Sequence, residues 1–177
     1  MIIKETALAG VLLIQPKVFR DSRGYFYEDF HNDKYINLFG SSLRCQDNVS
    51  CTYKGFIRGL HYQWPHPQGK LISVLHGQIF DVVVDIRRGS PTYGKWIGEI
   101  LNDETCLQLW VPPGFAHGFQ TISEKAVVTY KCTDNNWNPD CSRTVSYKDP
   151  ALKISWPLEE AKANSRDENA AFLENCA

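Results

Sequence analysis

The chain has 177 residues and a formal net charge of −1, from 19 basic and 20 acidic side chains. This length suits one domain, residues 1–177, with a full hydrophobic core. The charge balance excludes the basic excess on which general binding to nucleic acid or to an anionic membrane surface depends. No apolar run approaches the roughly 20 residues of a membrane span, and no charged-then-apolar leader opens the sequence, so we expect a cytoplasmic protein.

Helical periodicity is scarce along the chain. Short helices are predicted at residues 32–39, 157–163 and 169–176. Strand patterns fill the middle, at residues 71–75, 78–86, 95–101, 106–111 and 126–132, and the first two are expected to face each other across a turn. The apolar run at 82–84 predicts a strand buried on both faces. Short strands separated by frequent turns indicate an all-β sandwich or barrel, with the more helical C-terminal part packed over one end.

Six cysteines are scattered through the sequence without a C-x-x-C pair. Free thiols are therefore expected, and a zinc site is not. The segment His61-Tyr62-Gln63 also offers one histidine where metal-binding double-stranded barrels carry two, one residue apart. We therefore expect chemistry without a metal or an organic cofactor.

The segment 55–70 contains the highest density of candidate functional side chains. It places Arg58, His61, Gln63 and Lys70 on or just after one predicted strand. Arg58 and His61 would point to opposite faces of a regular strand, whereas His61 and Gln63 would share one. A titratable base beside two fixed cations suits an anionic substrate that must lose a proton.

A neutral imidazole needs a partner that fixes its tautomer, usually a carboxylate. The candidates for His61 are Glu28, Asp81, Asp85 and Asp167, and the residue pattern does not choose among them. Tyr130 lies on a predicted strand and would matter only if its hydroxyl faced His61 across a pocket.

Three further segments each have a functional and an ordinary interpretation. His117 lies between glycines, which indicates either an incidental turn residue or a backbone that a ligand approaches closely. Arginines and aromatics alternate at residues 19–30, which suits phosphate and base contacts but also a solvated loop leading to an edge strand. Gln46 and Asn48 could read a base or sugar edge, or lie in a polar turn.

Together these segments resemble the dTDP-4-dehydrorhamnose 3,5-epimerase family of cupin-like sugar epimerases. The resemblance runs from about residue 11 to residue 167. Its motifs include Phe19-Arg-Asp-x-Arg-Gly-x-Phe, Arg58-Gly-Leu-His-Tyr-Gln, Gly69-Lys-Leu, Phe80-Asp-Val-Val-Val-Asp-Ile-Arg, Gly89-Ser-Pro-Thr-Tyr-Gly, Pro113-Gly-Phe-Ala-His-Gly-Phe, Tyr130-Lys, Asp149-Pro and Ile154-Ser-Trp-Pro. The resemblance implies a double-stranded β-helix (jelly-roll) barrel that forms a homodimer with two active sites.

The resemblance also implies roles for individual residues. His61 matches the general base, Asp167 the carboxylate that orients it, Tyr130 the acid on the opposite ring face, and Lys70 the cation near the sugar O4. The implied substrate-binding set is Arg23, Phe26, Glu28, Gln46, Asn48, Arg58, His117, Trp137 and Arg166. The implied reaction converts dTDP-4-keto-6-deoxy-D-glucose to dTDP-4-keto-L-rhamnose by epimerisation at C3 and C5, in dTDP-L-rhamnose biosynthesis for polysaccharides such as lipopolysaccharide.

Three positions depart from the family pattern. The sequence 135–139 reads Asn-Asn-Trp-Asn-Pro where the family often has a tyrosine pair before the proline, and Trp137 is expected to take over stacking on the thymine. Ser142 replaces a usual glutamate, and Arg166 replaces a common lysine. Competing interpretations are an epimerase that acts at C3 or C5 only, a non-catalytic sugar-nucleotide-binding cupin, and a metal-dependent cupin enzyme.

Overall fold

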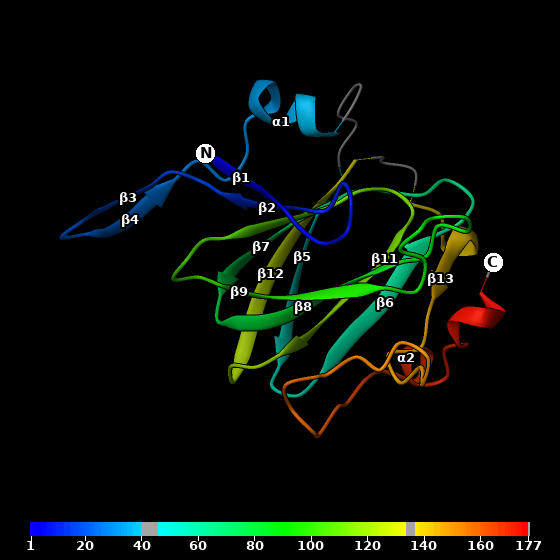
Figure 1. The fold of residues 1–177 in the computed structure, drawn as a ribbon. Coiled ribbons are helices and arrows are strands. Elements are labelled where there is room, and N and C mark those ends of the chain that lie inside the picture. Colours follow the sequence, from blue (N-terminus) through cyan, green and yellow to red (C-terminus); the bar gives the residue numbers. More distant parts are fainter. Residues whose placement is uncertain (40–45, 134–136, 177) are drawn as a thin grey trace.

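Two antiparallel sheets face each other in the computed structural model, which describes residues 1–39, 46–133 and 137–176 (Figure 1). The larger sheet has the strand order β1 (Ile2–Glu5), β2 (Leu12–Gln15), β10 (Gln108–Val111), β7 (Lys70–His76), β12 (Lys125–Cys132), β5 (Gln46–Tyr53). The smaller sheet has the order β13 (Ser142–Thr144), β6 (Ile57–Gln63), β11 (Phe115–Thr121), β8 (Gln78–Asp85), β9 (Trp96–Asn102). The expected all-β, cupin-like jelly-roll barrel is confirmed.

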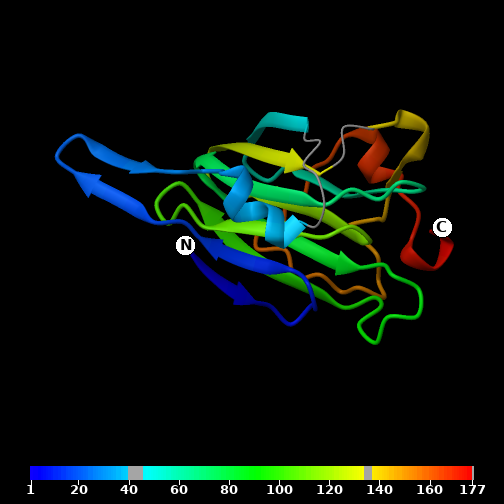
Figure 2. The same cartoon turned by 90° about the horizontal axis from the view of Figure 1, so that it is seen from above.

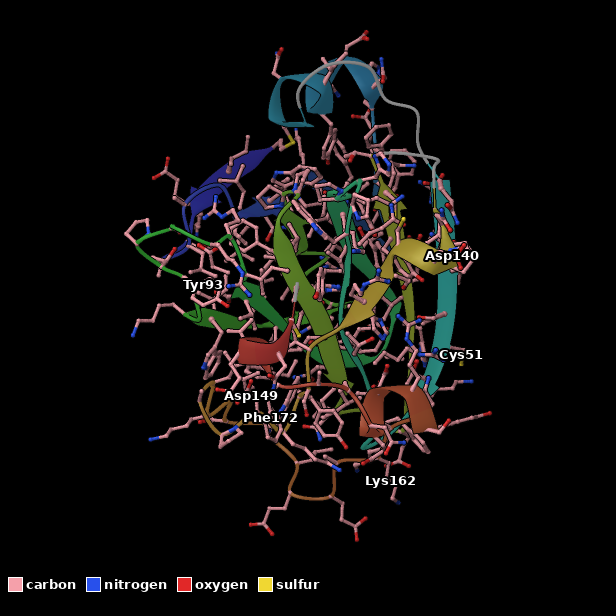
Figure 3. The ribbon with its side chains drawn as sticks, turned by 90° about the vertical axis from the view of Figure 1, so that its right-hand side faces the viewer. Cys51, Tyr93, Asp140, Asp149, Lys162 and Phe172 are labelled. Carbon is pink, nitrogen blue, oxygen red and sulfur yellow. The ribbon has the colours of Figure 1, made fainter. Side chains whose placement is uncertain are left out.

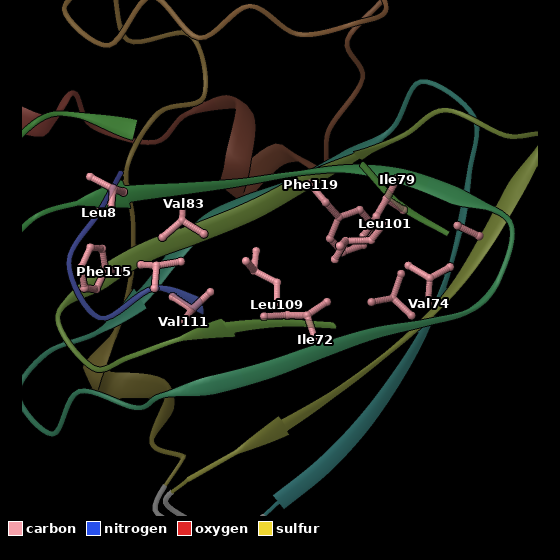
Figure 4. Packing of buried hydrophobic residues seen from close by; sticks show 13 residues of the cluster. Leu8, Ile72, Val74, Ile79, Val83, Leu101, Leu109, Val111, Phe115 and Phe119 are labelled. Atoms are coloured by element: carbon pink, nitrogen blue, oxygen red, sulfur yellow. The ribbon is translucent and has the colours of Figure 1, made fainter. Parts of the chain in front are cut away.

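The main core fills the space between the two sheets. Ile72 and Val74 from the larger sheet pack with Ile79, Val83 and Phe119 from the smaller one (Figure 4). Val82 and Val84 point the other way, into a second cluster under the C-terminal segment. The apolar run of β8 is therefore buried on both faces, as predicted, because each face has its own apolar partner layer.

The strands β7 and β8 follow each other with one residue between them but belong to different sheets. The predicted turn is correct, yet it carries the chain from one layer to the other instead of closing a hairpin. Gly77 has a φ of +81° and a backbone N–H that donates to Asp103 Oδ2 at 2.9 Å, so a glycine suits this crossing point.

Helices are few, as expected. The helix α1 (Asn32–Phe39) is confirmed, and it covers one end of the larger sheet, where Tyr35 packs on Ile14, Leu71 and Trp110. Near the C-terminus the structure has α2 (Ser165–Glu168), which Asn164 caps, and two short 3₁₀ turns, η1 (Pro139–Cys141) and η2 (Leu173–Asn175).

The predicted helix at 157–163 is wrong. Its backbone is bent at residues 157–159 and bonds to distant partners: the buried Gln120 side chain donates to the C=O of Leu158 and accepts from its N–H, both at 3.0 Å. Lys162 likewise exchanges backbone hydrogen bonds with Ile57 and Gly55. The predicted helix at 169–176 shrinks to η2, because Leu173 N–H donates to Asp149 Oδ2 at 2.7 Å. Tertiary hydrogen bonds thus override local helix propensity.

The strands β3 (Val18–Asp21) and β4 (Gly24–Tyr27) form a two-stranded hairpin that projects away from the two sheets, as Figures 1 and 2 both show. Its Phe26 side chain is 69% exposed. A two-stranded hairpin without a covering layer is marginal by itself, so this arm depends on what packs against it.

Candidate active site

A cavity of about 430 Å³ opens between the two sheets, where polar side chains replace the apolar core. Its walls come from β5, β6, β7, β11 and β12, with further contributions from Trp137, β13 and α2. The predicted site residues that line it are His61, Lys70, Tyr130, Gln46, Asn48, Arg58, His117, Trp137 and Arg166. Segments more than 100 residues apart in sequence therefore contribute to one cavity.

The strand β6 is irregular at the point where it enters this cavity. His61 pairs with His117 and Arg58 pairs with Phe119, so three steps along β6 match two along β11. Such a bulge brings onto one face of the sheet residues that would point to opposite faces of a regular strand. The expectation that Arg58 and His61 face opposite ways is therefore wrong, and both line the cavity.

Gly59 makes the bulge sterically possible. Its φ is +135°, and a Cβ there would lie 2.6 Å from the Cα of Gly118 on β11. A side chain at either glycine would push the two strands apart, because the backbones approach closely here. Gly118, next to His117, thus allows close contact between β6 and β11.

His117 lies in the buried strand β11 and not in the predicted turn.

His61 is paired with a buried carboxylate. Its Nε2 lies 2.8 Å from Oδ1 of Asp167, and the side chains are 37% and 1% exposed. The backbone N–H of Gly59 donates to the other oxygen, Oδ2, at 3.1 Å. The side chain of Asn164 accepts from the backbone N–H of Asp167 at 2.8 Å, which fixes the position of the carboxylate on α2.

The protonation of this pair follows from the surroundings of Asp167. Burial by itself raises the pKa of Asp167, but the hydrogen bond and charge of His61 outweigh it and hold the pKa below its ordinary value. The carboxylate is therefore ionised at neutral pH and can only accept. It follows that Nε2–H of His61 donates to Asp167, which leaves Nδ1 as the free basic atom.

A second histidine–aspartate pair lies deeper in the barrel. His117 Nε2 is 2.8 Å from Oδ1 and 2.9 Å from Oδ2 of Asp81, whose side chain is fully buried. Burial raises the pKa of Asp81, and His117 partly offsets this.

Each of the four carboxylates that could have paired with His61 therefore has its own ion-pair partner. The pairs are Asp81 with His117, Asp85 with Arg87, Glu28 with Lys34, and Asp167 with His61.

Three cations line the cavity without a carboxylate partner among the residues that the structure describes. Arg58 donates to Thr52 Oγ1 at 2.8 Å, and Arg166 donates to Ser142 Oγ at 2.8 Å, both neutral oxygens. Lys70 is partly buried, and this burial lowers its pKa. Arg58 and Arg166 are exposed, whereas Lys70 is partly buried, and the combined positive charge of the three favours an anionic ligand.

Tyr130 lines the same cavity as His61 from the opposite sheet, on β12. Burial raises its pKa above 10, with a further contribution from Cys132 and an opposing one from Arg58. The phenol therefore remains protonated at neutral pH and can donate a proton.

Three predicted binding residues lie elsewhere. Arg23, Phe26 and Glu28 belong to the projecting hairpin or follow it, and none of them lines the cavity of this chain. Arg23 pairs with Asp21 at 2.6 Å, and Glu28 pairs with Lys34 at 2.6 Å, all on exposed side chains.

Sequence reasoning missed some residues that the cavity uses. Gln68, Cys132 and Ser50 line it, and Ser142 joins as the partner of Arg166. Asp81 was considered only for His61, although an acidic residue inside the apolar run of β8 signals a buried partner. Trp137 is placed at the cavity, whereas Asn135 and Asn136 lie outside the described residues.

Within the described parts of the chain, no group of three or more His, Cys, Asp or Glu side chains could hold a metal ion, and no helix is long and apolar enough to cross a membrane. The five cysteines in those parts are free thiols, and Cys45 lies outside them.

Comparison with known proteins matches residues 5–175 to the family described as dTDP-4-dehydrorhamnose 3,5-epimerase. A relative of that name from Pseudomonas aeruginosa is 47% identical over 88% of this chain and 86% of its own length. One from Neisseria gonorrhoeae is 47% identical over 91% of this chain, which spans about half (49%) of that longer relative.

A solved structure agrees with this match. The dTDP-6-deoxy-D-glucose-3,5-epimerase RmlC of Legionella pneumophila, in complex with dTDP-4-keto-L-rhamnose, has a TM-score of 0.94 and 46% identity, covering 99% of this chain and 94% of that one. The matched residues include both strands and loops of the cavity. The chain therefore belongs to the dTDP-4-dehydrorhamnose 3,5-epimerase family.

Proposed function

We propose that this protein converts dTDP-4-keto-6-deoxy-D-glucose to dTDP-4-keto-L-rhamnose by epimerisation at C3 and C5, in dTDP-L-rhamnose biosynthesis in the cytoplasm. One observation carries the proposal: a single cavity holds an oriented imidazole, a protonated phenol and three cations without carboxylate partners in the described part of the chain. Family membership and the ligand of the Legionella structure support it.

The first step is removal of a proton next to the ketone. A C–H beside a carbonyl is acidic because the resulting anion spreads onto oxygen as an enolate, and a 4-keto sugar activates both C3 and C5. His61 Nδ1 takes the proton, and Asp167 stabilises the imidazolium that forms. No redox change occurs, so the reaction requires no nicotinamide.

The second step delivers a proton to the opposite face. The enolate charge lies at O4, where Lys70 stabilises it as it develops. Tyr130 donates its phenolic proton to the carbon from the face opposite His61, and the configuration inverts. The phenolate then recovers a proton from solvent while the imidazolium of His61 releases one, which closes the proton balance.

The remaining predicted site residues of the cavity are assigned to binding the rest of the substrate, mainly its nucleotide end. Arg58 and Arg166 are assigned to the diphosphate, since a guanidinium presents several donors to phosphate oxygens. Trp137 is assigned to stacking on the thymine, and Gln46 and Asn48 to polar contacts with base or sugar. His117 is assigned to the hexose. Each of them lines the cavity.

The activity should fall at alkaline pH because Lys70 loses its charge. Burial lowers the pKa of Lys70, so its ammonium is charged below a pKa that lies under the ordinary 10.5 and is lost as pH rises through it. Tyr130 has a raised pKa and stays protonated in the same range. A pH profile of kcat should therefore show an upper limb below 10.5, and Lys70→Met should remove this limb while lowering kcat by about tenfold or more.

Lys54 offers a matched control, because it is an exposed lysine paired with Glu124 on the surface. Lys54→Met should leave the upper limb of the profile in place. An upper limb that survives unchanged in Lys70→Met would contradict the assignment.

We further propose a homodimer in which the outer face of the larger sheet is the interface. Val49 and Tyr53 on β5 are each 67% exposed, and Leu75 on β7 is 46% exposed on the same outer face. Figure 3 shows Cys51, between the first two, at the outer edge of the molecule. An exposed apolar sheet face of this kind favours contact with a partner surface. A second copy of this chain can supply that surface, since the same face on both copies forms a two-fold symmetric interface.

A second copy also gives the hairpin residues a role. Arg23, Phe26 and Glu28 lie away from the cavity of their own chain, so they can bind the nucleotide only in the cavity of another chain. We therefore assign them to the partner's substrate.

The dimer is tested by light scattering on purified protein. We expect twice the chain mass of 20.2 kDa. Val49→Lys should produce monomer, because it places a charge in the interface, and should raise KM by at least about fivefold, because the hairpin contacts are lost. The control is Ile100→Lys, also an exposed apolar side chain but on β9 of the other sheet. A monomeric wild-type protein with full activity would contradict the proposal.

The function itself is tested by conversion. The purified protein, with no cofactor added for its own reaction, is supplied with dTDP-4-keto-6-deoxyglucose, a reductase that accepts only the L-rhamno product, and the reduced nicotinamide that this reductase consumes. Formation of dTDP-L-rhamnose is expected. Tight binding of dTDP without any conversion would instead indicate a non-catalytic sugar-nucleotide-binding protein.

A further inference from the structure

A second cavity, of about 320 Å³, lies beside the substrate cavity and has no part in the reaction above. The two share only Tyr62, Gln63 and Gln68 as a dividing wall. Its volume lies at the lower end of the range for small-molecule sites. It therefore has room for a ligand of its own, smaller than a nucleotide sugar.

The walls of this second cavity include three aromatic side chains. Trp64 is 51% exposed at its mouth, and Tyr62 and Phe115 are buried behind it. Pro67 and Ile86 complete the apolar lining. Aromatic walls of this kind bind flat rings by stacking and by edge contacts.

Arg87 forms a rigid part of the lining. Its Nε and Nη2 donate to the two oxygens of Asp85 at 2.9 and 2.7 Å, and its guanidinium lies 4.3 Å from the ring centre of Phe115. Burial alone raises the pKa of Asp85, but hydrogen bonds from Arg87, Ser90 and Thr92 outweigh it and lower the pKa, so the pair stays ionised. The charge of Arg87 is thus already neutralised and its plane is fixed.

Arg88 differs from its neighbour. Its Nη2 donates to the backbone oxygen of Cys176 at 2.9 Å, and within residues 1–39, 46–133 and 137–176 it forms no ion pair. It is exposed at the cavity and keeps a full positive charge. A guanidinium that has no carboxylate partner in the described residues, beside aromatic walls, favours a ring that carries a single negative charge.

We propose that this second cavity is a binding site for a flat aromatic monoanion, separate from the nucleotide-sugar site. A diphosphate would need more than one free cation, and a neutral sugar would gain little from the apolar walls.

The test uses two matched fluorescent probes and the full-length protein. The anionic probe is 8-anilinonaphthalene-1-sulfonate, and the neutral one is N-phenyl-1-naphthylamine, which has the same rings without the sulfonate. We expect saturable binding of the anionic probe with one site per chain, at least about fivefold tighter than the neutral one. Saturating dTDP should not displace it.

Variants locate the site. Arg88→Gln and Trp64→Leu should each weaken the anionic probe by at least about fivefold, and Arg88→Gln should not affect the neutral probe. The matched control is Arg143→Gln, an exposed arginine that lines neither cavity and should change nothing. Unchanged affinity in Arg88→Gln, equal affinity for both probes, or displacement by dTDP would overturn the proposal. Epimerase turnover, measured in parallel, tests the proposed function independently.

Discussion

His61→Asn should lower kcat by at least about 10² while leaving the Kd for dTDP within about twofold. The imidazole is the base of the proposed reaction, and its Nδ1 is free only because Asp167 occupies Nε2 at 2.8 Å. Asparagine keeps a polar group in the space but has no basic atom. Steady-state rates and calorimetric titration with dTDP separate the two effects.

The control for this experiment is His76→Asn, since His76 is an exposed histidine paired with Asp103 away from the cavity. It should keep wild-type kcat and dTDP affinity. If His61→Asn lost dTDP affinity to the same degree as turnover, His61 would be a binding residue and the assignment as base would be wrong.

Tyr130→Phe should uncouple proton exchange from inversion. Without the phenol no acid is present on the second face, so conversion should slow by at least about 10². His61 can still remove a proton, exchange it with solvent and return it to the same face. In deuterated water we expect recovered substrate that carries deuterium but keeps its configuration, which NMR detects.

Tyr93→Phe serves as the matched control, because Tyr93 is a half-exposed loop tyrosine outside the cavity. It should behave as wild type in both exchange and conversion. Absence of deuterium from C3 and C5 in the Tyr130→Phe reaction would show that Tyr130 has a role in the first step instead.

Much of the fold could be predicted because its signals are local. The apolar run of β8 and the amphipathic pattern of α1 each specify one element without reference to distant residues. The C-terminal segment could not be predicted in this way. Its conformation is set by bonds from Gln120 and Asp149, which lie 38 and 24 residues from their partners Leu158 and Leu173.

The site was predictable in its residue types but not in its pairing. His61 and Asp167 lie 106 residues apart, and four carboxylates were chemically equivalent candidates before the fold assigned each its own partner. The bulge at Gly59 could not be predicted from the sequence either, because a β-strand pattern assumes that side chains alternate regularly between the two faces. The backbone contact between Gly59 and Gly118 that places Arg58 beside His61 is a tertiary feature.

The most direct test of the account follows deuterium from solvent into the sugar ring. Wild-type protein is incubated with dTDP-4-keto-6-deoxyglucose in deuterated water, and C3 and C5 are followed by NMR. We predict that deuterium enters both positions with inversion at each. Entry at one position alone would reduce the activity to a single-site epimerase, and entry at neither would contradict proton abstraction by His61 altogether.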